Sequence, residues 1–226
     1  TPFQFVNPFI GTQGEGHTYP GATVPFGMVQ LSPDTEIKNF RQSFPWCAGY
    51  QYSDSTIIGF SHTHFSGTGH SDMGDILVMP AAGPLQLEPG PKENPDAGYR
   101  SRFSHADESA EPGYYSVVLK DAGIRAELTA TTRVGFHRYT FPRSDDAHVV
   151  LDLASSIYNY DGKVLWSQLR VESPTLVTGY RQTKGWAPNR HVYFAMEFSK
   201  PFVAGIVSIV HCAVIAVLAG PLPSQG

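Results

Sequence analysis

Cysteine is scarce in this chain of 226 residues, which has only two, Cys47 and Cys212. A domain held together by a disulfide framework needs several cysteine pairs, so this fold must depend on a buried apolar core. One bond between the two cysteines stays open on sequence grounds, although no motif supports it. With 41% hydrophobic residues, the chain can supply a core of the required size.

Charged residues are also few. They make up 16% of the chain, the net charge is -4, and lysine and arginine do not cluster anywhere. A protein that follows a phosphate backbone needs a basic surface. The composition therefore argues against nucleic acid as a partner.

The signatures of several other classes of protein are missing. There is no Gly-x-Ser-x-Gly elbow, and Gly67-Thr68-Gly69 lacks the third glycine and the helix start of a dinucleotide-binding loop. Cys47 has no evident orienting partner for a thiol nucleophile. The chain starts without Met and without a basic and then apolar leader, so we expect either a removed signal peptide or a sequence boundary there.

Short apolar runs rich in β-branched and aromatic residues fill most of the chain. Residues 1–80 contain such runs broken by Gly and Pro, and residues 81–98 have the composition of an exposed connection. The runs then recur about every ten residues, which predicts an all-β fold, an antiparallel β-sandwich. The predicted strands are 113–119, 124–131, 134–141, 147–153, 169–172, 176–183 and 191–198, with a hairpin turn at 121–123.

The densest concentration of polar chemistry is the segment GFSHTHFSGTGHSDMGDI at residues 59–76. It combines imidazoles, hydroxyls and carboxylates with glycines that let the backbone turn tightly and approach a ligand. His62 and His64 would project from one face if the segment is extended. The pattern is typical of polar recognition.

Several long motifs occur in a fixed order along the chain. They are VNPFIGT at 6–12, HTYPGA at 17–22, PFGMVQLSPDT at 25–35, WCAGY at 46–50 and GFHRYTFP at 135–142. Together with the segment at 59–76 they resemble the N-terminal domain of glycoside hydrolase family 92. The resemblance runs to about Phe198, and it implies a supersandwich-like domain similar to that of galactose mutarotase.

The resemblance carries expectations about activity. Members of the family are calcium-dependent, inverting exo-α-mannosidases, whose catalytic acid, base and calcium ligands come mainly from a C-terminal helical domain. Inverting hydrolysis requires both carboxyl groups. No part of this chain matches that domain, so we expect a mannose-containing glycan and the missing helical domain as partners, but neither a catalytic residue nor a complete calcium site here. The family is mostly bacterial and exported, which implies a secreted or periplasmic protein.

Five residues are the candidates for contact with the sugar: Trp46, His17, His62, Tyr19 and His64. Trp46 ranks first, because it lies where a loop enters a strand and falls where family members use an aromatic ring against the sugar beyond the scissile bond. A core position for Trp46, and a backbone-satisfied position for any single histidine, stay open as structural alternatives.

Other polar and aromatic residues are expected to be structural. The alternative reading of His62 and His64 as zinc ligands is disfavoured by the resemblance. Asp72 and Asp75 form too small a set for a metal ion, and we expect them to cap turns by accepting backbone N–H groups. We expect structural roles for His105, His137 and His148, and core positions for Trp166 and Trp186.

The last residues depart from this pattern. Residues 202–220 are almost continuously apolar, and the resemblance ends near Pro201, which divides the chain into a domain at 1–201 and a tail at 202–226. A truncated or frame-shifted end is the favoured interpretation. A membrane anchor and a buried helix or strand pair are the other two.

Two further functions stay open from the sequence. An autonomous carbohydrate-binding module would have the same sandwich, although the motif density at the N-terminus fits the shared pocket of an enzyme better. A surface protein anchored by residues 202–220 is the other, and membrane contact is expected only through that tail.

Overall fold

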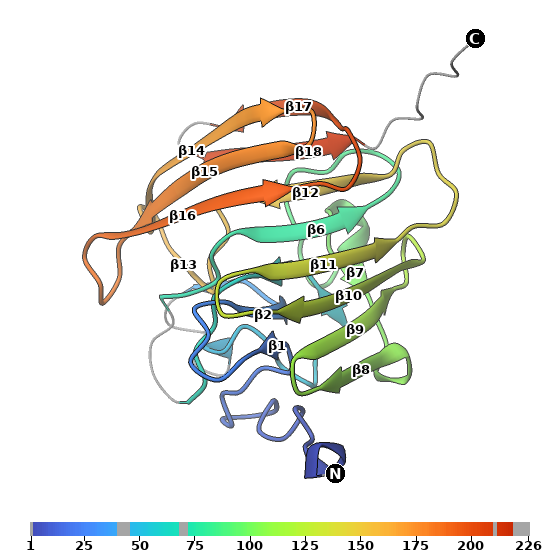
Figure 1. Cartoon of the computed structure of the whole chain (residues 1–226), viewed down its shortest axis with the longest axis vertical. Helices are drawn as coiled ribbons and strands as arrows, with labels where there is room; N and C mark the ends of the chain where they lie inside the picture. Colours follow the sequence, from blue (N-terminus) through green and yellow to red (C-terminus); the bar gives the residue numbers. More distant parts are fainter. Residues whose placement is uncertain (1, 40–45, 68–71, 210–211, 219–226) are drawn as a thin grey trace.

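The protein is described here by a computed structural model, which covers residues 2–39, 46–67, 72–209 and 212–218. Its main feature is a seven-stranded sheet in the order β1-β2-β5-β6-β12-β18-β17, paired antiparallel throughout (Figure 1). The strands are β1 (Ala22–Thr23), β2 (Gln30–Asp34), β5 (Gly59–Ser61), β6 (Leu77–Ala81), β12 (His148–Asp152), β17 (Val203–Ile209) and β18 (Cys212–Leu218).

A four-stranded antiparallel sheet covers one face of this central sheet. It consists of β8 (Glu108–Glu111), β9 (Tyr114–Leu119), β10 (Ile124–Ala130) and β11 (Gly135–Thr140). In β10 every second side chain is buried, as expected of a strand with one face on a core. The turn between β9 and β10 contains Gly123 at φ 63°, so the hairpin predicted at 121–123 forms with glycine in the left-handed region.

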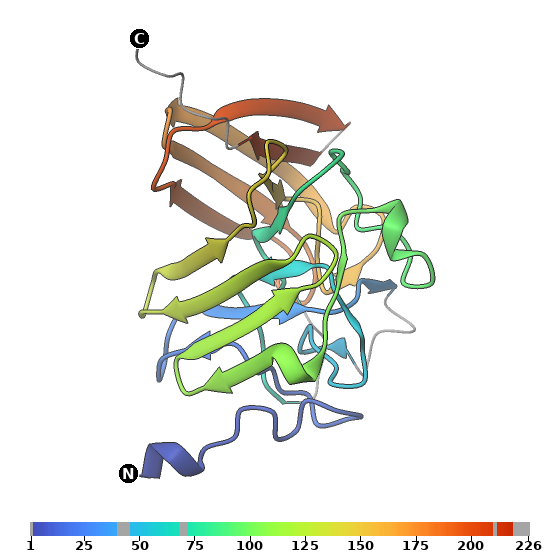
Figure 2. The same ribbon diagram turned by 90° about the vertical axis from the view of Figure 1, so that its right-hand side faces the viewer.

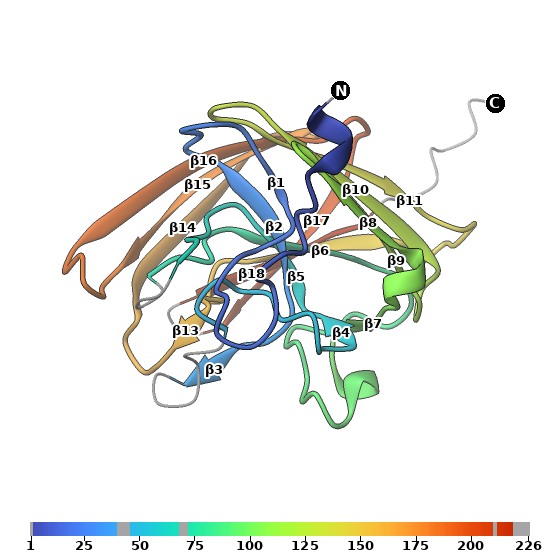
Figure 3. The same cartoon turned by 90° about the horizontal axis from the view of Figure 1, so that it is seen from below.

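A three-stranded antiparallel sheet packs on the opposite face. It consists of β14 (Val164–Ser173), β15 (Leu176–Thr183) and β16 (Arg190–Glu197). Viewed from below, β14 to β16 lie on one side of the strands of the central sheet, and β8 to β11 lie on the other (Figure 3). The molecule therefore has three layers of sheet.

The core shows why the central strands need two covering layers. Successive residues of β6 point to opposite faces, so Leu77 and Met79 join the cluster against the four-stranded sheet, while Val78 joins the cluster against the three-stranded sheet. In β12, Val150 and Leu151 divide in the same way. Strands covered on both faces read as continuous apolar runs, which is how these two strands read in the sequence.

Short elements complete the chain. The strand β3 (Lys38–Asn39) pairs parallel with β13 (Tyr158–Asn159), and β4 (Thr56–Ile57) pairs antiparallel with β7 (Ser101–Arg102). Single 3-10 turns occur at Pro2–Phe5, Pro95–Ala97 and His105–Asp107. The first of these turns and the β17–β18 pair lie at opposite ends of the long axis (Figures 1 and 2).

The all-β, antiparallel sandwich predicted from the spacing of apolar runs is confirmed, although the third layer was not predicted. The backbone of 203–209 pairs antiparallel with that of 212–218, which in turn pairs with β12, and the three interpretations of the apolar segment stay predictions. The predicted division of the chain at residue 201 stays a prediction. No helix in the described ranges is long and apolar enough to cross a bilayer.

The prediction of core positions for two tryptophans was wrong. Trp166 is 55% exposed and Trp186 is 76% exposed. Trp166 lies on β14 in the outer three-stranded sheet, and Trp186 lies in the turn between β15 and β16. An aromatic residue in a β-rich sequence is equally compatible with the outer face of a sheet, and only packing decides between the two.

Candidate functional site

The polar segment at 59–76 connects β5 to β6 and folds back on itself. The amide of His62 donates to the carbonyl of Asp75, and the amide of Gly74 donates to the carbonyl of Thr63, both at 2.9 Å. Ile76 ends the segment at φ 56°, which is a strained conformation for a β-branched residue. Strain of this kind persists only where surrounding contacts enforce it.

His64 is buried within this segment rather than presented to solvent. Its Nδ1 donates to the carbonyl of Gln30 at 2.7 Å, and its Nε2 lies 2.9 Å from the Asp34 carboxylate. Gly49 at φ 87° makes the pair possible, because a Cβ there would lie 2.2 Å from Asp34 Oδ1 and 2.9 Å from the imidazole. His64 thus ties the polar segment to β2.

His17 and Tyr19 approach the same region from the N-terminal motifs. His17, at φ 52°, is 2% exposed, and its Nδ1 lies 3.0 Å from the Cys47 thiol. The Tyr19 ring is partly buried, with its centroid 5.1 Å from that of His64. The fold therefore gathers His17, Tyr19 and His64 near the WCAGY motif, two of them below the surface.

Trp46 is partly exposed and has a fixed indole. Its Nε1 donates to Asp54 Oδ2 at 2.7 Å, and the other oxygen of Asp54 accepts from Lys92 Nζ. Asp54 is 3% exposed, so the carboxylate that holds the indole is buried. The polar edge of the indole is thus anchored, and the ring is accessible in part.

His62 faces away from this group, toward the four-stranded sheet. Its Nδ1 donates to the carbonyl of Ile76 at 2.7 Å, so the neutral ring accepts at Nε2, 3.0 Å from His137 Nε2. His137 Nδ1 then accepts from the hydroxyl of Tyr139 at 2.7 Å. The expectation that His62 and His64 would share a face if extended does not apply, because the strand ends at Ser61.

Burial sets the protonation states of His62, His137 and Tyr139, which are joined by hydrogen bonds. Burial lowers the pKa of His62, an effect that the hydrogen bond to Ile76 opposes. Burial also lowers the pKa of His137 well below its usual value, and the neighbouring His62 adds to the effect. Burial raises the pKa of Tyr139 well above its usual value. All three groups are therefore held neutral.

Asp72 and Asp75 take part in ion pairs that the expectation of turn caps did not include, although Asp72 Oδ2 also accepts the amide of Ala187, in the turn between β15 and β16, at 3.0 Å. Asp75 is fully buried between Arg181, at 3.2 Å, and Arg190, and it also accepts from Thr63 at 2.6 Å. Asp72 pairs with Lys163 at 3.1 Å. Burial raises the pKa of Asp75, but the two guanidinium groups outweigh it and hold the pKa below its usual value. These pairs fasten the polar segment to the three-stranded sheet.

The same contacts test whether the carboxylates fit a calcium ion. A calcium site needs several oxygens that face one point. Those of Asp72 and Asp75 accept from cationic side chains, the Thr63 hydroxyl and the amide of Ala187 instead, and no group of three or more potential metal-binding side chains occurs in the part of the chain that the structure describes. The donor set therefore does not fit the ion.

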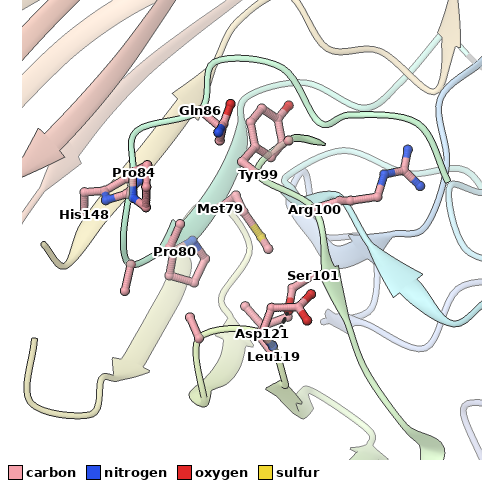
Figure 4. A pocket seen from close by; sticks show the side chains of 14 residues that line it. Met79, Pro80, Pro84, Gln86, Tyr99, Arg100, Ser101, Leu119, Asp121 and His148 are labelled. Atoms are coloured by element: carbon pink, nitrogen blue, oxygen red, sulfur yellow. Dashed lines mark hydrogen bonds between the residues drawn. The ribbon is translucent and has the colours of Figure 1, made fainter. Parts of the chain in front are cut away.

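Two pockets lie near the connection at 81–98. The smaller, about 100 Å³, is bordered by Met79, Tyr99, Ser101 and His148 and contains none of the five candidate residues (Figure 4). The larger, about 380 Å³, is lined by charged and polar side chains that include Lys92. Its other polar members are Glu36, Glu88, Glu93, Arg100, Asp152, Ser155 and Asn159.

Lys92 connects the larger pocket to Trp46, because its ammonium pairs with the carboxylate that holds the indole. Glu88 borders the same pocket, where burial, followed by the charge of Asp152, raises its pKa. Sequence reasoning missed Asp54, Lys92 and Glu88, since a lone carboxylate or lysine in a loop carries no pattern.

Comparison with known proteins agrees with the motif analysis. Residues 5–208 match the sequence model of the family described as "Glycosyl hydrolase family 92 N-terminal domain". A protein described as an uncharacterized secreted glycosidase of Arthroderma benhamiae is 30% identical over 152 residues, which are 63% of this chain and 18% of that protein.

Solved structures give the same answer. One is a family GH92 α-mannosidase of Bacteroides thetaiotaomicron, determined in complex with mannoimidazole, which is 41% identical to this chain with a TM-score of 0.85. The match covers 97% of this chain and 30% of the chain of that enzyme. The GH92 glycosyl hydrolase ccman5 is 28% identical with a TM-score of 0.76, over 96% of this chain and 30% of its own. This chain spans about a third of the length of these enzymes, and it belongs to the N-terminal domain family of glycoside hydrolase family 92.

Proposed function

We propose that this chain is the N-terminal part of an inverting exo-α-mannosidase that removes terminal mannose from glycans. The observation that supports it most is the 41% identity, over 97% of this chain, to an α-mannosidase solved with mannoimidazole. In this proposal a helical domain provides the catalytic acid, base and calcium, and the longer protein is secreted or periplasmic. The present domain supplies one wall of the pocket and the surface on which the helical domain rests.

Trp46 is the proposed contact with the leaving sugar. Its indole is anchored at Nε1 by Asp54, and an aromatic face can pack against the C–H surface of a pyranose. His17, Tyr19 and His64, which lie near the WCAGY motif, are proposed to shape this wall, and His62 is proposed to support it from its contact with the four-stranded sheet. In the described structure His17 and His64 are buried, so any role in binding is exerted through the residues that they hold.

An exposed apolar patch supports the second role of the domain. Its large side chains are strongly exposed: 104% for Phe26, 61% for Met28, 54% for Val134 and 66% for Phe136. The amide of Met28 donates to the carbonyl of Thr132, which joins the turn between β1 and β2 to the turn between β10 and β11. Phe26 is also strained, at φ 59°. A group of large apolar side chains in water is typical of a surface that another domain covers.

An activity assay tests whether this chain contains the catalytic residues itself or needs a helical domain to supply them. We expect the chain alone to release no product from an aryl α-mannoside, with or without calcium, and a version extended through a helical domain to do so. Glu88→Gln, Asp72→Asn and Asp75→Asn variants complete the test. Turnover by the chain alone that one of these substitutions abolishes without lowering the melting temperature would overturn the proposal, because it would place a catalytic carboxyl here.

Trp46 is tested in the extended protein. Trp46→Ala should lower kcat/KM by the equivalent of ~1 to 3 kcal/mol with little change in the melting temperature. Trp186→Ala is the matched control, since that ring is 76% exposed and lies in a different turn. Normal kinetics for Trp46→Ala would contradict the assignment. Sugar binding by the chain alone, with no activity in the extended protein, would favour an autonomous carbohydrate-binding module.

A further inference from the structure

We infer that Asp54 and Lys92 are positioning residues, which hold the indole of Trp46 in the orientation that the sugar requires. The inference rests on the proposed contact between Trp46 and the leaving sugar. It goes further by assigning two residues outside the recognised motifs to the same wall. Neither residue touches the sugar in this scheme, and both act through the ring.

The geometry forms a short chain of contacts from the indole to a pocket. Trp46 Nε1 donates to Asp54 Oδ2 at 2.7 Å, which is short for a nitrogen donor and typical of a charged acceptor. Asp54 Oδ1 accepts from Lys92 Nζ, and Lys92 borders the pocket of about 380 Å³. One carboxylate thus joins the ring to a side chain of the pocket wall.

The burial of Asp54 makes its contact with the indole restrict the orientation of the ring. The Asp54 side chain is 1% exposed, whereas that of Lys92 is 33% exposed. A buried carboxylate is costly unless donors surround it, so the indole N–H and the ammonium both satisfy a group that water does not reach. An indole has only one N–H, and fixing it to a buried acceptor limits the rotation of the ring.

Such restriction has a catalytic consequence. A ring that is already in place loses less conformational freedom when the sugar binds, and a misplaced group of this kind can cost up to about 100-fold in rate. The Cys47–His17 pair lies next to Trp46 in the chain, and the indole nitrogen itself donates to Asp54. Asp54 is therefore the group whose change should move the ring.

The first experiment needs no catalysis. The 226-residue chain has three tryptophans, so its indole N–H groups give three NMR signals, assigned by Trp166→Phe and Trp186→Phe. The Trp46 signal should lie downfield of the other two and exchange with deuterium more slowly. In Asp54→Asn, which keeps an oxygen acceptor but loses the charge, it should move upfield, and in Asp54→Ala it should move further and exchange faster.

The second experiment measures kinetics in the extended protein. Asp54→Ala should lower kcat/KM by about 10-fold to 100-fold, Asp54→Asn should restore part of the loss, and Lys92→Met should give a smaller loss. Asp107→Ala is the control, because Asp107 also pairs with a lysine, Lys120, but both side chains are 47% exposed. If Asp54→Ala does not fold, Asp54→Asn and the exchange rate of the unaltered chain still decide.

The outcomes separate the two ideas. Normal kinetics in Trp46→Ala would refute the proposed contact between Trp46 and the sugar, and the positioning inference with it, whatever Asp54 does to the indole signal. Impaired kinetics in Trp46→Ala, combined with an unmoved indole signal and normal kinetics in both Asp54 variants, would refute positioning alone. A merely structural Asp54 would lower the melting temperature and leave kcat/KM intact well below it, and that result also overturns the inference.

Discussion

Replacing Asp75 tests how strongly the polar segment is fastened to the three-stranded sheet. Asp75 and Arg181 are both 0% exposed at the side chain, and Arg190 completes the group. Removing one partner of a buried ion pair typically costs about 3 to 5 kcal/mol, because the other charge stays buried. Asp75→Ala should therefore rank among the most destabilising single changes in the chain.

The structure places the expected value near the lower end of that range. Arg181 keeps hydrogen bonds to the carbonyl of Ser155 at 2.5 Å and to the hydroxyl of Ser156 at 2.6 Å, which continue to solvate the guanidinium. A loss of about 3 kcal/mol corresponds to a fall of roughly 6 to 12 °C in melting temperature for a domain of this size. Arg181→Met should cost a similar amount.

The assay is unfolding by urea and by heat, followed by circular dichroism at neutral pH. Asp96→Ala is the matched control, since Asp96 also pairs with an arginine, Arg102, but is 73% exposed. It should leave the unfolding midpoint unchanged. The double variant Asp75→Leu with Arg181→Met should be less destabilised than the sum of the single changes, because the two residues interact directly.

The pH dependence gives an independent check with a definite sign. The pKa of Asp75 is lowered in the folded state, so its stabilising contribution is complete above the ordinary aspartate pKa of about 3.9 and is lost as pH falls through the folded value. The difference between the native chain and Asp75→Ala should thus be constant from pH 7 to about pH 5 and shrink only in more acidic solution. A difference below about 1 kcal/mol at neutral pH, or one that disappears already near pH 6, would refute the reasoning.

Three further predictions concern other parts of the molecule. Because burial lowers the folded pKa of His62 and His137, stability should fall as pH decreases below about 6.5, by up to about 1.4 kcal/mol per pH unit for each ring; His137→Phe should flatten this slope in urea titrations, and the exposed His191→Phe should not. Deleting residues 202–226 should lower the melting temperature, because β12 would lose its pairing with β18; an unchanged melting temperature with better solubility would instead support a tail outside the fold. Gly49→Ala should destabilise the chain by at least ~1 kcal/mol in the same assay, since its Cβ would meet Asp34 Oδ1 at 2.2 Å and its φ is 87°, and the open position Gly67→Ala is the comparison.

Local patterns were sufficient for most strands. Alternation and β-branched residues predicted 124–131 and 176–183, which agree with β10 and β15 to within a residue. Glycine supplied the turn at 121–123. These features depend on nearest neighbours along the chain, so they can be recognised without knowledge of the tertiary structure.

The candidate site was only partly accessible to the same reasoning. The motifs identified the family and the segment at 59–76, but they did not show that His62 and His64 contact different sheets. Their partners, His137 and Asp34, are 75 and 30 residues away. Contacts over such separations follow from how the layers are stacked, and no local pattern encodes them.

By itself the sequence determined an all-β chain with few cysteines, little charge and a set of ordered motifs that identify its family. Composition and periodicity fix these properties, because each depends on residue type and spacing alone. Only the tertiary structure decided that a third sheet covers β6 and β12, that Asp75 is an ion-pair centre, and that a buried Asp54 holds Trp46. Burial and partnership are properties of the packed layers, and the free energy of a charge or a ring depends on them.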